Sequence, residues 1–142
     1  MMVAAALAAL VAGLAADVIA PPSQPRSPGR VRPPDSVTCS RDRLTAYTGV
    51  VTRFSRQPER TELEIRTDWG TMEAVVVTHD GDSGPERWFL IRTKPFQATD
   101  WMVIEAAPGK LRKDVRATAW VCEDGRNPIV DWNPAAEPPP GR

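Results

Sequence analysis

The dominant pattern in this chain is an alternation of apolar and polar residues that recurs in four separate runs. These runs cover residues 44–54, 62–66, 72–77 and 115–121. Successive side chains of an extended strand point to opposite faces, so a period of two places apolar side chains on one face. A shorter run, residues 101–105, makes a fifth candidate strand. The pattern predicts an all-β fold of five half-buried antiparallel strands.

The residues between these runs are typical of turns. The segment 67–70 contains Gly70, which can supply the positive φ of a tight hairpin, and segments 57–60 and 107–110 contain proline. The longer connection 80–100 has apolar residues that we expect to close one end of the fold, as a short helix. In the first run, one face carries Leu44, Ala46, Thr48, Val50, Thr52 and Phe54, and the other carries Thr45, Tyr47, Val51 and Arg53.

The first 20 residues resemble a secretory signal. Residues 1–16 are all Met, Val, Ala, Leu or Gly, as in the apolar core of a signal peptide. The first basic residue is Arg26, so the usual positive segment ahead of the apolar core is missing. A retained membrane anchor and a buried helix are therefore alternatives. We expect segment 1–20 to be a signal peptide or membrane anchor of a periplasmic or secreted protein of bacterial type.

Proline marks the remaining segment boundaries. Residues 21–34 contain six prolines, each of which removes a backbone donor and fixes φ. Segment 21–38 is therefore predicted to be a proline-rich linker with an extended, polyproline-like conformation. The tail 134–142 is also rich in proline and is expected to be disordered. Residues 39–133 then form the folding unit.

The cysteines and the charge narrow the possible functions. Cys39 and Cys122 lie at the two ends of the folding unit, and an even cysteine count in an exported chain predicts a disulfide. With a single histidine, the chain lacks the ligands of a tetrahedral zinc site, and we expect no metal and no cofactor. The formal net charge is zero, which weighs against binding of duplex nucleic acid.

Three strands in a meander, a long connection and two further strands follow one another over residues 43–122. This order resembles the OB-fold, a five-stranded Greek-key barrel, and Gly49 in the first strand fits the sharp bend of such a barrel. Another small barrel or sandwich with a similar strand count is the alternative. The resemblance implies a ligand surface on the face of strands two and three and on the loops after strands one and four.

Six residues map to that surface by position. They are Arg60, Glu64, Arg66, Trp69, Glu73 and Lys110. Aromatic side chains beside arginines can stack on bases or sugars and contact phosphates. We also expect Trp69, Trp101, Trp120 and Trp132 to face outward or to lie at loop edges. The alternative is that tryptophan closes the ends of the fold and covers neighbouring strands.

Segment 80–91 contains two motifs that invite a catalytic or metal-binding interpretation. Gly81-Asp82-Ser83-Gly84-Pro85 resembles the nucleophile loop of chymotrypsin-like serine proteases, but those enzymes take their histidine from a distant segment. Here the histidine is His79, four residues before Ser83. The segment also partly resembles a calcium loop, yet positions 5 and 12 counted from Asp80 are Gly84 and Ile91. Both motifs are more typical of a solvated turn, and a looser calcium site at this acidic segment is the alternative.

The sequence therefore predicts a non-enzymatic protein. We expect an exported OB-like binding or interaction module of the cell envelope, with a protein or an oligosaccharide as its partner. Binding of single-stranded nucleic acid on the same face is an alternative, although nucleic acid is a disfavoured partner. A structural subunit of an envelope assembly is a further alternative.

Overall fold

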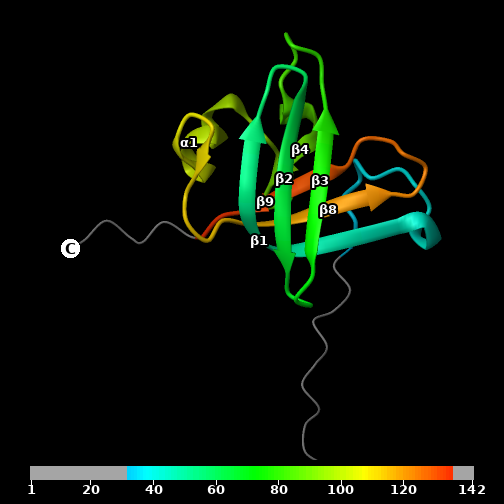
Figure 1. The fold of residues 1–142 in the computed structure, drawn as a ribbon. Coiled ribbons are helices and arrows are strands. Elements are labelled where there is room, and N and C mark those ends of the chain that lie inside the picture. The colour runs from blue at the N-terminus through cyan, green and yellow to red at the C-terminus, as the bar shows by residue number, and fades with distance from the viewer. Residues whose placement is uncertain (1–31, 136–142) are drawn as a thin grey trace, which may run out of the picture. The chain divides into compact units, whose positions relative to one another are not determined.

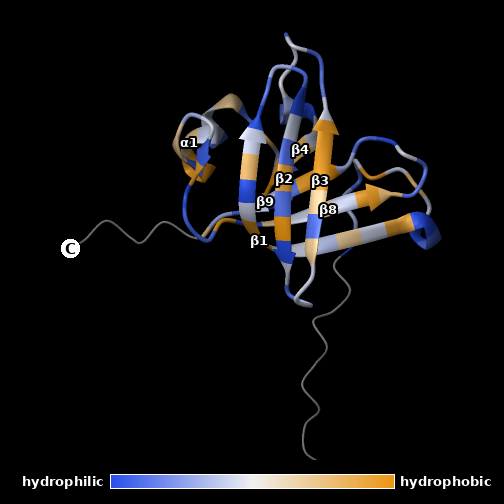
Figure 2. Ribbon diagram, in the orientation of Figure 1, coloured by the Kyte–Doolittle hydropathy of each residue, from blue (hydrophilic) through white to orange (hydrophobic). Residues whose placement is uncertain are grey.

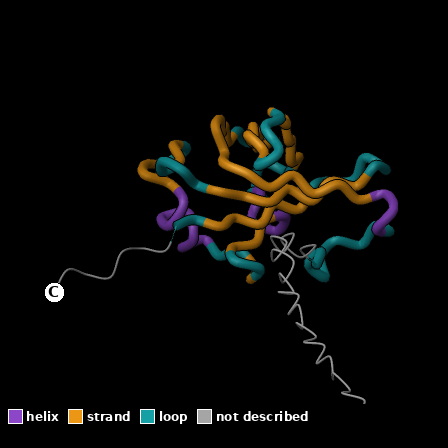
Figure 3. The backbone as a smooth tube through the Cα atoms, turned by 90° about the horizontal axis from the view of Figure 1, so that it is seen from below, coloured by secondary structure: helices purple, strands orange, loops and turns teal. Residues whose placement is uncertain are grey.

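The computed structural model describes residues 32–135, so the expected signal segment, most of the expected linker and residues 136–142 lie outside the described part. The strands are β1 (Leu44–Arg56), β2 (Arg60–Thr67), β3 (Met72–Thr78), β4 (Phe89–Ile91), β5 (Lys94–Pro95), β6 (Glu105–Ala107), β7 (Lys110–Leu111), β8 (Arg116–Cys122) and β9 (Ile129–Asn133). The helical segments are α1 (Trp101–Ile104) and the 3-10 helices η1 (Arg41–Arg43), η2 (Pro85–Trp88) and η3 (Ala98–Asp100). Strands dominate this part of the chain, and the helical segments are short (Figure 3).

Seven of the strands form one mixed sheet in the order β3-β2-β1-β8-β9-β4-β5, and β6 and β7 form a separate hairpin (Figure 1). All neighbours are antiparallel except β4 and β9, which are parallel. The partial order β8-β1-β2-β3 is that of a Greek key, because the fourth long strand returns to lie beside the first. The β-rich fold is confirmed. The expected five-stranded barrel is replaced by a seven-stranded sheet, and the described strands do not close into a barrel.

Strand β1 joins two parts of the sheet that run in different directions. Residues 44–50 pair with β8, and the strand pairs with β2 from Gly49 onward. In Figure 1, β2 and β3 run across the direction of β8 and β9. A Cβ atom at Gly49 would overlap the carbonyl oxygen of Arg66 on β2. Glycine at this position is therefore required by the close approach of two backbones, where β1 turns from one part of the sheet to the other.

A β-bulge makes the side chains of β1 lie on other faces than the alternation predicts. The pairing with β2 shifts between Val51 and Arg53, so one extra residue lies in β1. An extra residue moves every following side chain to the opposite face. Val51 is buried before the bulge and Phe54 packs against the core after it, although the alternation placed them on different faces. Thr52, expected on the face of Phe54, is exposed.

The main core is built around five aromatic rings. The rings of Phe54, Phe89, Phe96, Trp101 and Trp132 meet at centroid distances of 5.0–6.3 Å, mostly edge to face. Such contacts add about 0.5–1.5 kcal/mol per pair beyond the burial of area. A second, smaller cluster contains Leu90, Trp120 and Ile129, with Val37, Leu44 and Trp88 packed against it. As expected, the connection 80–100 supplies residues that close the core.

Two expectations about secondary structure need correction, and one further strand was not predicted. Residues 101–104 form the helix α1 instead of a strand, because the capping box of Gln97 and Asp100 starts a helical turn immediately before them. The connection 80–100 adds β4 to the sheet, whereas its helix η2 is a single 3-10 turn. The run after Cys122 contains a full strand, β9, which pairs with both β8 and β4.

The ends of the folding unit are tied together. Cys39 and Cys122 form the expected disulfide, with Cα atoms 6.1 Å apart. Val37, inside the expected linker, packs on the second cluster, and Pro134, inside the expected tail, is buried. Both segments therefore contribute residues to the folded part. Within residues 32–135, no helix has the length and apolar character needed to cross a bilayer.

Candidate binding surface

Strands β2 and β3 separate a buried face from an outer face. Along β2, Thr61, Leu63, Ile65 and Thr67 are buried, and along β3 Val75 and Val77 are buried. The alternate positions make up what we call the outer face, which consists of Arg60, Glu62, Glu64 and Arg66 on β2 and Met72, Ala74, Val76 and Thr78 on β3. The outer face is therefore charged along β2 and mainly apolar along β3, where Figure 2 shows mostly orange ribbon.

Most of the charged side chains on the outer face of β2 make polar contacts within the domain. Arg60 Nε lies 2.8 Å from Glu62 Oε1, and the Thr52 hydroxyl at the bulge donates to Glu64 Oε1 at 3.2 Å. Arg66 is exposed and makes no recorded side-chain hydrogen bond or ion pair within residues 32–135. Its guanidinium group is therefore free to meet a ligand.

The hairpin between β2 and β3 presents Trp69 to solvent. The Gly70 N–H donates to the Thr67 carbonyl at 2.9 Å, and Gly70 has the positive φ of 86° that the turn requires. Asp68 anchors the turn, because its N–H donates to Thr48 and its carboxylate pairs with Arg116 at 2.6 Å. Trp69 is 88% exposed. A well-held turn thus carries an indole ring that touches little of its own domain.

The structure brings together some of the six residues expected at the site and separates others. Arg60, Glu64 and Arg66 share the outer face of β2, and Trp69 lies at the end of that hairpin. Glu73 pairs with the buried Ile65, and directly opposed residues of antiparallel strands share a face, so Glu73 lies on the other side of β3. Lys110 lies on the separate β6–β7 hairpin.

Lys110 borders a basic hollow that the sequence reasoning missed. The hollow has a volume of about 420 Å³ and lies between the bulge of β1 and residues 109–114. Its charged residues are Arg53, Lys110, Arg112, Lys113 and Asp114. The signal in the sequence is the basic run 110–113, in which Leu111 is the single uncharged residue. The positive charge lies on two segments about 60 residues apart in sequence, and the fold unites them.

Three of the four tryptophans expected at the surface are buried. Trp101 is 9% exposed, Trp120 is 4% exposed and Trp132 is fully buried. Trp120 does share a strand face with Thr118, as expected, but the second cluster covers its ring. The expectation was wrong because residues remote in sequence, including Val37 and Leu90, form that cover.

The glycine-rich segment does not form a catalytic triad. His79 and Ser83 line one hollow of about 260 Å³ with Asp80, Trp88 and Asn127. His79 Nε2 lies 3.0 Å from the Thr61 hydroxyl, and no hydrogen bond between Ser83 and His79 occurs in the described part of the chain. The Ser83 N–H donates to the Asp80 carbonyl, which is the pattern of a turn.

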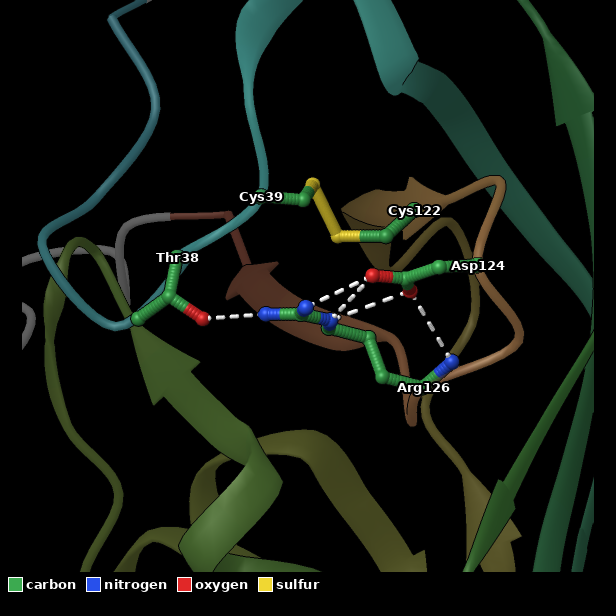
Figure 4. A network of polar contacts seen from close by, with 5 residues as sticks. All are labelled: Thr38, Cys39, Cys122, Asp124 and Arg126. Atoms are coloured by element: carbon green, nitrogen blue, oxygen red, sulfur yellow. Dashed lines mark hydrogen bonds and ion pairs between the residues drawn. A yellow bond between two sulfur atoms is a disulfide. The ribbon is translucent and has the colours of Figure 1, made fainter.

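Two polar contacts support the ends of the domain. Beside the disulfide, Arg126 Nη1 donates to the Thr38 hydroxyl at 2.6 Å, and Arg126 Nε donates to Asp124 Oδ2 at 2.8 Å (Figure 4). The hydrogen bonds from Arg126 lower the pKa of Asp124 below its ordinary value.

On β9, burial raises the pKa of Asp131, although the Thr93 N–H donates to its carboxylate at 3.0 Å.

A partly buried ion pair lies at the far end of β1. Arg56 Nη2 is 3.3 Å from both carboxylate oxygens of Glu105, whose side chain is 6% exposed. The Arg56 guanidinium carbon also lies 4.0 Å from the centre of the Trp101 ring. Arg56 therefore neutralises a buried carboxylate and covers an aromatic core residue with the same group.

These arrangements can bind a partner. Within residues 32–135, the hydroxyl within hydrogen-bond distance of His79 is that of Thr61, which is fully buried and therefore out of reach of a substrate. Trp69 and Arg66 lie at one end of the outer face, and the basic hollow lies on the other side of the bulge in β1. No protein-family model matches this chain, and no curated protein or solved structure shows significant similarity to it.

Proposed function

We propose that this chain is an exported, non-enzymatic interaction module of OB-like form that binds a protein of the cell envelope through the outer face of β2 and β3. The observation that carries the proposal is the exposure of Trp69. Each of the other four tryptophans is buried or half-buried, so the fold covers this residue type wherever it can.

The surroundings of Trp69 support a protein interface. Tryptophan and arginine are enriched among the residues that dominate binding energy, and here Arg66 lies on the outer face three residues before Trp69. Met72 and Val76 are 51% and 45% exposed, so an apolar strip continues from the turn along β3. The pair of Arg60 and Glu62 forms a polar border beside this strip. An apolar centre with a polar rim is the ordinary anatomy of a protein interface.

The OB-like form and the export are supported by separate observations. The Greek-key order of the long strands and the bend of β1 at Gly49 are in keeping with an OB-like relation. In such folds the second and third strands form the usual ligand face. The disulfide between Cys39 and Cys122 is of a kind that persists in oxidising compartments. It is compatible with a periplasmic or secreted protein.

A matched pair of double variants tests the proposed surface. The full chain is used to recover partners from the native host, and the affinity of each recovered partner is then measured with purified proteins. Trp69→Ala combined with Arg66→Ala should weaken binding at least tenfold. The control, Met102→Ala combined with Arg41→Ala, removes another exposed apolar residue and another exposed arginine, both outside the outer face and the basic hollow, and should leave affinity unchanged. Equal affinity of wild type and the first variant would refute the surface.

The basic hollow supports a second candidate function. Four basic side chains and one acidic side chain line it, so the local charge is positive although the whole chain is neutral. Such a hollow favours an anionic strand, either single-stranded nucleic acid or an acidic oligosaccharide. Affinity for a labelled oligonucleotide should then fall steeply between 50 and 200 mM salt. If no oligonucleotide is retained at low salt, the nucleic-acid function is excluded. A stable complex with other envelope proteins that contains no small ligand would favour a structural subunit instead.

A further inference from the structure

Strand β3 is an edge of the seven-stranded sheet, and alternate residues turn their backbone groups away from β2. The His79 N–H donates to Glu59, and the Thr67 N–H donates to Thr71, which sets the phase of the β2–β3 ladder. In an antiparallel ladder, backbone groups of successive residues point to opposite sides. The N–H and C=O groups of Met72, Ala74, Val76 and Thr78 therefore point to the free edge.

Thr78 shows that this edge accepts a partner. Its N–H donates to Asn127 Oδ1 at 3.0 Å, and Asn127 Nδ2 donates to its carbonyl at 2.6 Å. The amide side chain of Asn127 thus pairs with Thr78 as the backbone of a neighbouring strand would. The backbone groups of Met72, Ala74 and Val76 point away from β2, and within residues 32–135 no second strand pairs with β3. The backbone hydrogen-bonding groups of this edge are therefore paired at Thr78 and unpaired along the rest of β3.

The two edges of the sheet differ in their protection. Strand β5, at the other edge, has two residues, Lys94 and Pro95, and shortness, lysine and proline are the usual defences against pairing with another chain. Strand β3 has seven residues and none of them is lysine or proline. Its outward side chains are apolar or small. An edge of this kind is a template for strand addition.

A groove of about 460 Å³ follows the open edge. Its β3 wall contains residues 73–76 and Thr78, and its far wall contains residues 125–128. Tyr47, Val121 and Cys122 complete the lining. Asn127 lies where the next strand would lie beside Thr78. A single extended segment can continue that position toward Met72 between the two walls. A second sheet would meet the far wall.

The charge in the groove selects among extended segments. Glu73 and Arg126 are the charged residues of the lining. Arg126 is held by Asp124 and Thr38, whereas Glu73 makes no ion pair in the described part of the chain. Its carboxylate favours a lysine or arginine on the incoming strand. Two copies of β3 paired about Ala74 would make the two Glu73 side chains diagonal neighbours, and pairing one residue away would set them directly opposite each other. Like charges meet in both of these registers, which disfavours them, and the concentration dependence of amide exchange tests pairing between two copies.

We propose that β3 binds an extended, non-proline segment of a partner protein by strand addition, with a basic residue beside Glu73 and small apolar residues over Tyr47 and Val121. This inference rests on the proposed function, and it adds the mode of binding and the chemistry of the partner segment. Main-chain hydrogen bonds to Met72, Ala74 and Val76 supply affinity, and the groove side chains supply selectivity.

Amide hydrogen exchange on the dilute full chain tests the state of the edge. The amides of Ala74 and Val76 should exchange nearly as fast as those of an unstructured peptide, whereas those of Val75 and Val77 should be protected by β2. Protection of Ala74 and Val76 in the dilute monomer would overturn the proposal. Protection that appears with rising protein concentration would assign the edge to a second copy and would also overturn it.

Two capped probe peptides, acetyl-Lys-Thr-Val-Thr-Val-Thr-amide and acetyl-Thr-Val-Thr-Val-Thr-Lys-amide, test both strand directions. At least one should bind saturably and protect the amides of Ala74 and Val76. Replacement of its lysine by glutamate should weaken binding at least tenfold with the wild-type chain, and Glu73→Lys should reverse that preference. Failure of both peptides to bind would overturn the proposal.

Proline substitution separates backbone pairing from side-chain contact. Val76→Pro removes an N–H that the fold does not use, and edge positions tolerate proline. It should weaken peptide binding at least tenfold, and the matched control Val76→Thr, which keeps the N–H, should bind within threefold of wild type. Ala74→Pro serves the same purpose if Val76→Pro fails to fold. If a native partner is lost with Trp69→Ala but retained with Val76→Pro, the outer face stands and strand addition is refuted.

Discussion

Reduction of the Cys39–Cys122 disulfide should remove a large part of the stability of this domain. The bridge joins residues 83 apart in sequence, so it closes nearly the whole folded segment into one loop. In the chain-entropy model, a loop of that length raises the free energy of the unfolded chain by about 4.5 kcal/mol at 25 °C. Small domains are stable by about 5–15 kcal/mol in total. The reduced protein should therefore be close to marginal.

Urea denaturation with and without a reductant measures this loss. Trp120 and Trp132 are buried, so their fluorescence reports exposure of both hydrophobic clusters. We expect the unfolding free energy to fall by about 4–5 kcal/mol on reduction, with a steeper dependence on urea because the uncrosslinked chain expands further. Reduction keeps both side chains, so no cavity is created at the buried Cys122.

The polar network at the same junction supplies the control. Arg126→Ala removes the contacts with Thr38 and Asp124 but leaves the disulfide in place. Exposed ion pairs contribute about 0–1 kcal/mol, so this variant should remain within about 1 kcal/mol of wild type. A loss below about 1.5 kcal/mol on reduction would refute the reasoning, because the bridge would then constrain an unfolded chain that is already compact.

Three further predictions concern the sheet and its charges. Gly49→Ala should cost about 2–3 kcal/mol or more in urea denaturation, because its Cβ would overlap the Arg66 carbonyl, whereas Gly81→Ala, with ordinary contacts, should stay within about 0.5 kcal/mol. Arg56→Ala should cost about 2–3 kcal/mol because it leaves Glu105 buried and unpaired, and Glu62→Ala, which removes an exposed pair, should cost less than about 1 kcal/mol. The third concerns Asp131, whose pKa is raised above 3.8 by burial. The folded state therefore keeps this proton at pH values where the unfolded state has lost it, and the free energy of unfolding falls as the pH rises through that window. Asp131→Asn should remove this decline, so the melting temperature of the variant minus that of wild type should increase between pH 3.5 and 7; a constant difference would contradict the assignment.

The sequence predicts the local elements of this fold well and their faces less well. The alternation around Leu63 and Val75 correctly predicts β2 and β3 as strands. The face of β3 was predicted less well, because Glu73, expected at the ligand surface, lies on the same face as the buried Val75. In β1 the same reasoning fails beyond Val51, since a bulge depends on how two strands pair and leaves no mark on the alternation of one strand. Strand β9 is missed because a short apolar run becomes a strand when β8 and β4 flank it.

In the candidate site, too, features set by local sequence are predicted and features that depend on distant segments are not. Arg60, Glu64 and Arg66 are placed together by local periodicity, and the turn at Gly70 places Trp69 beyond them. Lys110 joins a basic hollow through contacts between distant segments, which no local pattern encodes. Burial of a tryptophan is likewise a property of the whole fold, because the cover comes from several elements.

The burial of the other tryptophans strengthens the inference drawn from Trp69. A large apolar side chain is expected to be covered whenever a neighbouring element can reach it, and in this domain Val37 and Leu90 cover Trp120. Trp69 lies on a turn that Asp68 fixes against Arg116, so its exposure does not follow from a loosely held loop. The exposed apolar strip continues from this turn along the one long edge of the sheet that lacks lysine and proline. An exposed indole and an unpaired strand edge on one hairpin leave a free domain open to unwanted association, and a partner that covers both would prevent it.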